Sequence, residues 1–549
     1  MKEQEKKRPW IKSVVPEMAP PSLSDNTADV DRLVKAIGKA LPGKPVITDY
    51  LLIRDIASTL RRCEYRVEAV LFEEGDRWHL VGVLPVVEDH ALFGLAVDLG
   101  SSTLVVRLLD LNTGESVDES SFHNPQIQIG TDILARIHFA AKDGGLQELQ
   151  ALVRNCLNRE ITALCEKHRI APDRITGVAV AGNTTMTHLF LGLDPYWICR
   201  EPYIPIINSP PLIKGKDLGL AVNPGAPVLV FPNVGSYFGG DLIAGILASG
   251  MNREKEVSLL VDVGTNAEVV IGNSEWLMAC AGAAGPALEG GVADMGMMAG
   301  PGVIDKVTID PETEAFHIRT IDNREPVGIC GSGLIDLVAQ LYLSGMIDLR
   351  GKFVSRRCGD RLVERDGIRE LVVVPPERSA TGKALTLAQT DVDGLVRSKA
   401  AMFTILITLA NTVNIPLMEI HRFFVAGTFG SYIDPRSAIT VGMIPDLPLE
   451  RYVSLGNTSL EGATLGLLSI DARKDISIIR DRVTYLELNV NQEFMNLFSA
   501  AKFIPHTEKS LFPSVKPHGM VDNPRPLQLE SKGRSSADRG HGAGFQRPK

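Results

Sequence analysis

Hydrophobic and polar positions follow one pattern before Leu92 and another after it. The first part predicts helices over residues 30–37 and 49–60, where apolar residues recur at helical spacing, and strands over 65–72 and 78–84. From Leu92 onward, short apolar runs alternate with amphipathic stretches, which is typical of α/β proteins. The chain therefore predicts a small α+β module followed by a larger α/β region.

The α/β region begins with a predicted strand, tight hairpin and second strand over residues 93–106. Its turn joins a carboxylate, Asp98, to an unhindered backbone at Gly100 and to small hydroxyl residues. The amides of Ser101 to Thr103 could face phosphate oxygens, and Asp98 could hold Mg²⁺ directly or through water. An ordinary hairpin turn explains the same residues, so this motif alone leaves both interpretations open.

A second hairpin with the same arrangement occupies residues 259–270, with Asp262 in the place of Asp98. Two such hairpins in one chain indicate a duplicated fold with a nucleotide between its halves. The pair is much stronger evidence than either member.

Further glycine turns open predicted helices or follow predicted strands. The turn over residues 182–186 either points helix amides at an anion or simply caps a helix. The remaining stretches of this kind are 239–241, 279–291, 328–336, 422–430 and 456–463. The small residues of 279–291 make a poor core and allow a close approach by a ligand or another backbone.

Composition and charge exclude several classes of protein. Hydrophobic residues make up 44% of the 549 positions, charged residues make up 22%, and the formal net charge is −9. Nothing in this balance favours nucleic acid or an anionic membrane as a partner. The charged N-terminus has no apolar signal segment, and no run approaches the about 18 apolar residues that span a bilayer. We expect a cytoplasmic protein.

The seven cysteines are scattered and contain no C-x-x-C pair, which argues against a disulfide framework, a zinc site or an iron–sulphur cluster. They are Cys63, Cys156, Cys165, Cys199, Cys280, Cys330 and Cys358.

The motifs together resemble the ATPase fold of actin, sugar kinases and heat-shock chaperones. The closer resemblance, over about residues 15–506, is to reductive activators of corrinoid proteins. It is carried by the two hairpins and by the stretches 24–33, 183–186, 231–234, 456–463 and 503–506. The expected fold is a duplicated actin-like (ribonuclease H-like) α/β ATPase of two subdomains, preceded by a small α+β module.

This resemblance and the shifts in composition predict five segments. They are a flexible arm (1–22), the α+β module (23–88), a first ATPase subdomain (91–252), a second one with the closing C-terminal elements (255–505), and a disordered tail (506–549).

The resemblance also implies site residues. Asp98 and Asp262 would organise Mg²⁺ and water, with Asp241 as a third catalytic acid. The phosphates and adenosine of ATP would lie against Gly100, Ser101, Ser102, Thr103, Gly264, Thr265, Asn266, Gly331, Gly333, Gly427, Thr428 and Gly430.

The implied function is an ATP-driven activator that helps to reduce cob(II)alamin to cob(I)alamin in a corrinoid methyl-transfer protein. Family activators usually carry an iron–sulphur cluster, and no cluster can be placed among these cysteines. We therefore expect a separate ferredoxin-like electron donor, or an ATP-dependent task without electron transfer.

Two alternatives remain open from the sequence. In a sugar-type kinase, Asp241 at a helix start would act as the general base toward a substrate hydroxyl. In a partner-binding module, the nucleotide cleft would have no redox role.

Overall fold

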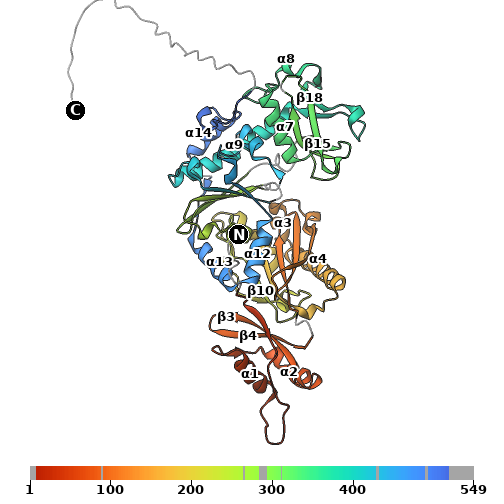
Figure 1. The fold of residues 1–549 in the computed structure, drawn as a ribbon, viewed down its shortest axis with the longest axis vertical. Helices are drawn as coiled ribbons and strands as arrows, with labels where there is room; N and C mark the ends of the chain where they lie inside the picture. The colour runs from red at the N-terminus through yellow and green to blue at the C-terminus, as the bar shows by residue number, and fades with distance from the viewer. Residues whose placement is uncertain are drawn as a thin grey trace, which may run out of the picture.

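In this computed structural model, the described residues are 8–87, 91–263, 266–283, 293–310, 312–427, 432–488 and 492–517. Figure 1 shows a long molecule, with the N-terminal module at one end of the long axis. The two large sheets occupy the middle, and the elements around β15, β18, α7 and α8 form the opposite end. Strands and helices alternate through most of the chain, which confirms the α/β fold class.

The N-terminal module is a mixed sheet in the order β1-β3-β4-β2, covered on one face by two helices. Residues on alternate positions of β3 pack under the helices, while Val70 and Phe72 point to the other face and join the core of the ATPase. The elements are β1 (Ile11–Val14), α1 (Asp29–Ala40), β2 (Val46–Ile47), α2 (Tyr50–Arg62), β3 (Val67–Glu74) and β4 (Arg77–Pro85).

The prediction of a flexible arm over residues 1–22 is wrong for residues 8–14. Strand β1 pairs with β3, and Trp10 is fully buried, with its indole nitrogen donating to the Gly466 carbonyl at 3.0 Å. The guanidinium of Arg473 lies 4.0 Å from the Trp10 ring centroid. Gly177 leaves room for Ile11, whose Cδ1 would lie 2.2 Å from a Cβ at that position. These apolar side chains join the module to the ATPase, and residues 1–7 lie outside the described residues.

The first ATPase sheet has the order β7-β6-β5-β8-β10-β9. Helices α3, α4 and α5 cover one of its faces, as the shared core of their apolar residues shows. Its elements are β5 (Phe93–Leu99), β6 (Thr103–Asp110), β7 (Ser116–His123), α3 (Ile133–Ala140), α4 (Gly145–His168), β8 (Ile175–Gly182), α5 (Thr184–Leu191), β9 (Ile213–Lys214), β10 (Pro227–Val230) and α6 (Gly240–Ser249).

The second ATPase sheet repeats this topology. Its order is β21-β20-β11-β12-β13-β22. As in the first sheet, the first three strands in the chain form an antiparallel meander, and the next two, β20 and β21, run parallel to β11. The elements are β11 (Ser258–Val263), β12 (Asn266–Gly272), β13 (Leu277–Ala283), β20 (Arg422–Ala426), β21 (Tyr452–Gly456) and β22 (Val483–Tyr485). The duplication expected from the two hairpins is therefore present in the strand order.

Helices α6 and α12 (Thr458–Leu468) lie between the two sheets. A single hydrophobic core joins residues of both helices with Ala96 and Ala179 of the first sheet and Leu260 and Phe424 of the second. The helices approach very closely, because a Cβ at Gly462 would lie 2.3 Å from the Ala244 carbonyl oxygen. This contact sets the spacing of the two sheets.

The far end of the molecule contains smaller sheets, β15-β14-β16 and β17-β18-β19, packed with α7 and α9 into one core. The elements are β14 (Val303–Ile309), β15 (Phe316–Thr320), β16 (Gly328–Ile329), α7 (Gly331–Leu343), α8 (Ser355–Cys358), β17 (Leu362–Arg365), β18 (Ile368–Val374), β19 (Leu385–Ala388), α9 (Gln389–Thr412), α11 (Pro435–Val441) and α14 (Gln492–Ala501). Helix α13 (Ile470–Arg482) lies instead in the middle of the molecule (Figure 1), where it shares the core of α6 and α12.

The prediction of a disordered tail from His506 is wrong for residues 506–517. The buried ammonium group of Lys399 donates to the carbonyls of Phe503 and Pro505, the latter at 2.6 Å. Phe512 is 2% exposed and packs against Phe403 with ring centroids 5.3 Å apart. The chain is therefore anchored on α9 beyond the predicted boundary, and residues 518–549 lie outside the described residues.

Candidate functional site

Asp98 and Asp262 occupy equivalent places in the two sheets. Each is the next-to-last residue of a central strand, Asp98 in β5 and Asp262 in β11. Neighbours two residues before them, Ala96 and Leu260, belong to the core between the sheets. Because side chains alternate along a strand, both carboxylates point into the same space between the sheets. The structure thus brings the two predicted acids together.

Asp241 joins them from the first turn of α6. Its Oδ1 accepts a hydrogen bond from the Leu242 amide at 2.8 Å. A Cβ on Gly239 would lie 2.5 Å from that Oδ1 and 2.5 Å from the Cα of Asn183. Only glycine therefore fits at position 239, where the start of α6 lies against Asn183, the N-cap of α5.

A fourth acid, Glu268, was not predicted as a site residue. It pairs directly with Asp262 across the hairpin of β11 and β12. Like charges placed opposite each other destabilise a sheet, so the pair is not explained by folding. A comparison of the two hairpins could have indicated Glu268 as a site residue. The residue opposite Asp98 in the first hairpin is the apolar Val105, whereas the residue opposite Asp262 in the second is an acid.

All four acids have raised pKa values, chiefly because they are buried and, for three of them, also because of a neighbouring negative charge. Burial and the charge of Asp262 raise the pKa of Asp241 to about 7, and burial and Asp98 raise the pKa of Asp262 to about 6. Burial, Asp262 and Asp241 raise the pKa of Glu268 well above its usual range. Burial also raises the pKa of Asp98, against a hydrogen bond from Asn457 that lowers it. A cation would relieve this crowding of negative charge.

Mg²⁺ fits this set of donors. In the parts of the chain that the structure describes, no group of three or more His, Cys, Asp or Glu side chains is close enough to ligate one metal ion. Mg²⁺ usually takes one or two carboxylates and fills its other positions with water and substrate phosphates. Asp98 and Asp262 would hold it in this way, directly or through water.

Two asparagines fix the first hairpin; the sequence placed them at helix starts but did not predict them as site residues. Asn457 caps α12 and donates its Nδ2 to Asp98 Oδ2 at 2.8 Å. Asn183 caps α5 through the Met186 amide and donates its Nδ2 to Ser101 Oγ at 3.0 Å. The turn at residues 182–186 is therefore a capped helix start that also contacts the predicted phosphate loop.

The other predicted ligand residues fall into three groups. Gly427 lies at the cleft with φ of +79°, and a Cβ there would lie 2.9 Å from Asp262 Oδ1. Gly331 and Gly333 open α7, where a Cβ on Gly333 would meet the Ile304 carbonyl oxygen at 2.4 Å. Close packing on β14 thus explains Gly333, and its contact with a nucleotide stays a prediction. Gly264, Thr265, Thr428 and Gly430 lie outside the described residues, and Asn266 opens β12.

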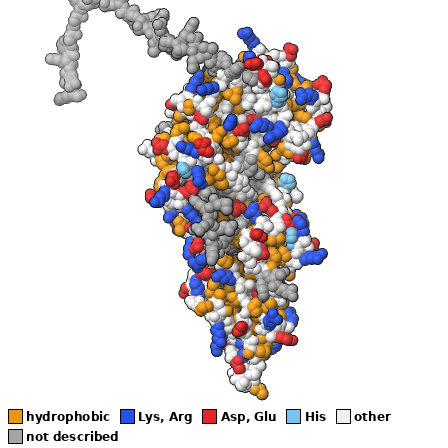
Figure 2. Space-filling model, in the orientation of Figure 1, with side chains coloured by type: hydrophobic (Ala, Val, Ile, Leu, Met, Phe, Trp, Pro, Cys, Tyr) orange, Lys and Arg blue, Asp and Glu red, His pale blue; other side chains and the backbone are white. Residues whose placement is uncertain are grey.

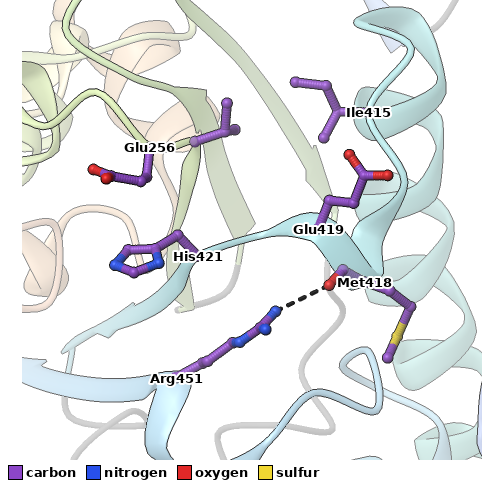
Figure 3. A pocket seen from close by; sticks show the side chains of 7 residues that line it. Glu256, Ile415, Met418, Glu419, His421 and Arg451 are labelled. Carbon is purple, nitrogen blue, oxygen red and sulfur yellow. Dashed lines mark hydrogen bonds between the residues drawn. The ribbon is translucent and has the colours of Figure 1, made fainter.

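A separate pocket of about 480 Å³ lies at the opposite end of the second sheet (Figure 3). Glu256 and His421 precede β11 and β20, so they sit at the strand ends away from Asp262. Arg451 in its wall donates to the Met418 carbonyl at 2.9 Å. This pocket contains none of the predicted site residues, and the cleft remains the candidate site.

The raised pKa values predict that the cleft lowers stability at neutral pH. The folded pKa of Asp241, about 7, lies above its ordinary value of 3.8. Its contribution to stability is therefore present below pH 4 and is lost as the pH rises through 7. We expect Asp241→Asn to raise the melting temperature at pH 8, and to raise it less at pH 5, in thermal unfolding without nucleotide.

Asp118 serves as the control, because its pKa is shifted in the opposite direction from that of Asp241. Hydrogen bonds from Lys167 and His168 hold the pKa of Asp118 below the usual range. Asp118→Asn should lower the melting temperature at pH 8. An Asp241→Asn protein that melts below the wild type at pH 8 would contradict the electrostatic account of the cleft.

Charges of both signs are interspersed over the face in Figure 2. None of the helices in the described ranges is both long enough and apolar enough to cross a bilayer.

Comparisons with known proteins agree with this architecture. The sequence matches the RACo linker region over residues 2–89, the RACo middle region over 93–254 and the C-terminal ASKHA domain of RACo over 256–516. A solved structure, "Reductive activator for corrinoid,iron-sulfur protein", superposes with a TM-score of 0.83 at 36% identity, covering 93% of this chain and 82% of that one.

Two curated relatives carry related names. The corrinoid activation enzyme RamQ of Eubacterium limosum is 31% identical over 422 residues, which cover 75% of this chain and 70% of RamQ. The [Co(II) methylated amine-specific corrinoid protein] reductase of Methanosarcina barkeri is 22% identical, over 74% of this chain and 76% of its own. The chain belongs to the RACo family of reductive activators of corrinoid proteins, with an actin-like ATPase domain.

Proposed function

We propose that this protein binds Mg·ATP in the cleft of Asp98, Asp241 and Asp262 and hydrolyses it to activate a corrinoid methyl-transfer protein. The activation is the reduction of cob(II)alamin to cob(I)alamin in that partner. The observation that carries the proposal is the crowding of four acids between duplicated hairpins, in a chain 31% identical to a corrinoid activation enzyme.

Bound Mg²⁺ would neutralise charge on the ATP phosphates. Asp98 and Asp262 would hold the metal and its waters from the ends of β5 and β11. With a pKa of about 7, Asp241 can accept a proton from an attacking water at neutral pH. The paired asparagines, Asn457 and Asn183, keep the first hairpin in place during this step.

ATP is needed because the reduction of cob(II)alamin is energetically uphill from ordinary cellular donors. A nucleotide can shift that equilibrium only by binding the states of the complex with different affinities. Helices α6 and α12 lie between the sheets. The N-cap of α12, Asn457, donates to Asp98 of the first hairpin, and Asp241 in the first turn of α6 feels the charge of Asp262 in the second. We expect these two helices to transmit the change between the ATP-bound and ADP-bound states to the surface that binds the corrinoid protein.

We place the electron source in a separate iron–sulphur protein. The seven cysteines of this chain are widely spaced in sequence and are free thiols, most of them buried. Burial raises the pKa of Cys280 to about 12 and that of Cys358 to about 11, which makes both thiols poor ligands at neutral pH.

The proposal is tested by mixing the protein with a corrinoid methyl-transfer protein in the cob(II)alamin state and an artificial reductant. We expect Mg·ATP to cause conversion to cob(I)alamin, followed in the visible spectrum, and Asp262→Asn to prevent it. ATP-dependent complex formation with an unchanged cobalt spectrum would instead identify a binding module without a redox role. No effect of ATP on either measurement, with every corrinoid protein tried, would refute the proposal.

A sugar-type kinase is the second candidate, because a carboxylate with a pKa of about 7 at a helix start also suits a general base. A panel of sugars and polyols separates the two functions. Stimulation of ATP consumption by a hydroxyl substrate favours the kinase, and stimulation by a corrinoid protein favours the activator.

A further inference from the structure

Arg136 lies directly behind the first hairpin and is fully buried. Its Nη2 donates to the Ser101 carbonyl at 2.7 Å, and its Nε donates to the Gly130 carbonyl at 2.9 Å. Nη1 points to Met186 Sδ at 3.2 Å and Gln126 Oε1 at 3.4 Å. All of these acceptors are neutral.

A buried guanidinium is normally paired with a carboxylate, because the cost of removing its charge from water is large. Across the described ranges, Arg136 forms no ion pair, and Asp132 at the α3 cap is the acid whose charge acts on it. Its positive charge therefore lies, with no carboxylate partner in the described residues, directly behind the turn that follows Asp98. Packing alone does not explain why this position carries a charge.

Asn124 completes the contact with the back of the hairpin. Its backbone amide donates to the Ser102 carbonyl, and its Nδ2 donates to the Gly100 carbonyl, both at 2.9 Å. Together with Arg136, it holds three consecutive carbonyls, those of Gly100, Ser101 and Ser102. The Oδ1 atom of Asn124 accepts from the Gln126 amide, which fixes the side chain.

Peptide geometry then sets where the hairpin amides point. In a planar trans peptide, the carbonyl and the following N–H point in opposite directions. Since the carbonyls of Gly100 and Ser101 face Asn124 and Arg136, the N–H groups of Ser101 and Ser102 face away from them. Neither amide donates to a residue in the described part of the chain. Successive free amides of this kind form an anion-binding concavity.

We propose that Arg136 and Asn124 are positioning residues that hold the hairpin amides toward the polyphosphate of the nucleotide. This inference rests on the proposed nucleotide cleft. The amides of Ser101 and Ser102 would contact the phosphates, and Arg136 and Asn124 would raise the affinity indirectly, by fixing the direction of those amides.

The test compares wild-type protein with Arg136→Met and Arg136→Lys for binding of ATP, ADP and adenosine by calorimetry and competition. We expect Arg136→Met to weaken ATP and ADP by about tenfold or more, the effect of losing a charged hydrogen bond, with adenosine unchanged. Arg136→Lys keeps the charge and should recover part of the loss. Asn124→Asp keeps the Gln126 contact, loses the donor to Gly100, and should show the same selectivity.

Arg32→Met is the control, because Arg32 is also a buried arginine but is ion-paired with Asp25 in the N-terminal module, away from the hairpins. It should lower stability without changing the ratio of ATP to adenosine affinity. Equal losses for ATP and adenosine in folded Arg136 and Asn124 variants, or no loss, would overturn the inference. Wild-type protein that binds no ATP would refute the nucleotide cleft itself, and this inference with it.

Discussion

Replacing Asp262 by asparagine is expected to reduce Mg·ATP hydrolysis by a hundredfold or more, on the order of the loss of one key electrostatic group in an active site. The carboxylate is one of two that would position the metal. Its partner Glu268 would lose one of the two negative charges that, together with burial, raise its pKa. Binding of ATP without Mg²⁺ should be unchanged or tighter, because one negative charge leaves the cleft. Hydrolysis is measured as phosphate release, and binding by calorimetry.

Asp391→Asn is the matched control for this experiment. Asp391 is also buried, and burial also raises its pKa, but it caps α9 by accepting from the Ala388 amide outside the cleft. Its variant should keep the wild-type hydrolysis rate. A folded Asp262→Asn protein, or a folded Asp98→Asn protein, that hydrolyses Mg·ATP at the wild-type rate would remove these residues from the site.

The second large effect is expected at the contact between α6 and α12. A Cβ on Gly462 would lie 2.3 Å from the carbonyl oxygen, 2.5 Å from the Cα and 2.6 Å from the carbonyl carbon of Ala244. All three are backbone atoms, so Gly462→Ala forces the helices apart. We expect a loss of about 2 kcal/mol or more in the free energy of unfolding, measured in urea. The KM for ATP should also rise, because α12 carries Asn457 to Asp98.

Gly38→Ala provides the control within a helix. Gly38 lies in α1, has no heavy atom within 4 Å of an added Cβ, and should gain up to about 1 kcal/mol from the higher helix propensity of alanine. If Gly462→Ala is as stable as the wild type, α6 and α12 can separate freely. They would then not set the spacing of the sheets.

The hairpins illustrate what could be predicted from the sequence. The apolar run, the acid and the glycine at Asp98 are local features, and their repetition at Asp262 indicated the duplicated α/β fold that the strand order confirms. Amphipathic segments could be predicted as well, since the expected helix over 49–60 is α2, Tyr50–Arg62. Local periodicity determines these elements because each depends on neighbours within a few residues.

The predictions for residues 8–14 and 506–517 were wrong for the opposite reason. Polar and proline-rich composition around Trp10 and Phe512 indicated disorder, yet each aromatic ring packs against residues hundreds or about one hundred positions away. A few apolar side chains anchored on a distant surface outweigh the average composition of a segment.

The sequence by itself determined the fold class, the duplicated acidic hairpins and the family to which the chain belongs. Only the tertiary structure decided that Glu268 faces Asp262, that Asn457 reaches Asp98, and that Arg136 lies behind Ser101. These partners are between 6 and 359 positions apart in the chain, and the distances between them depend on hairpin register and on how α12 and α3 dock. Those contacts set the charge balance of the cleft, and it cannot be predicted from the pattern of neighbouring residues in the sequence.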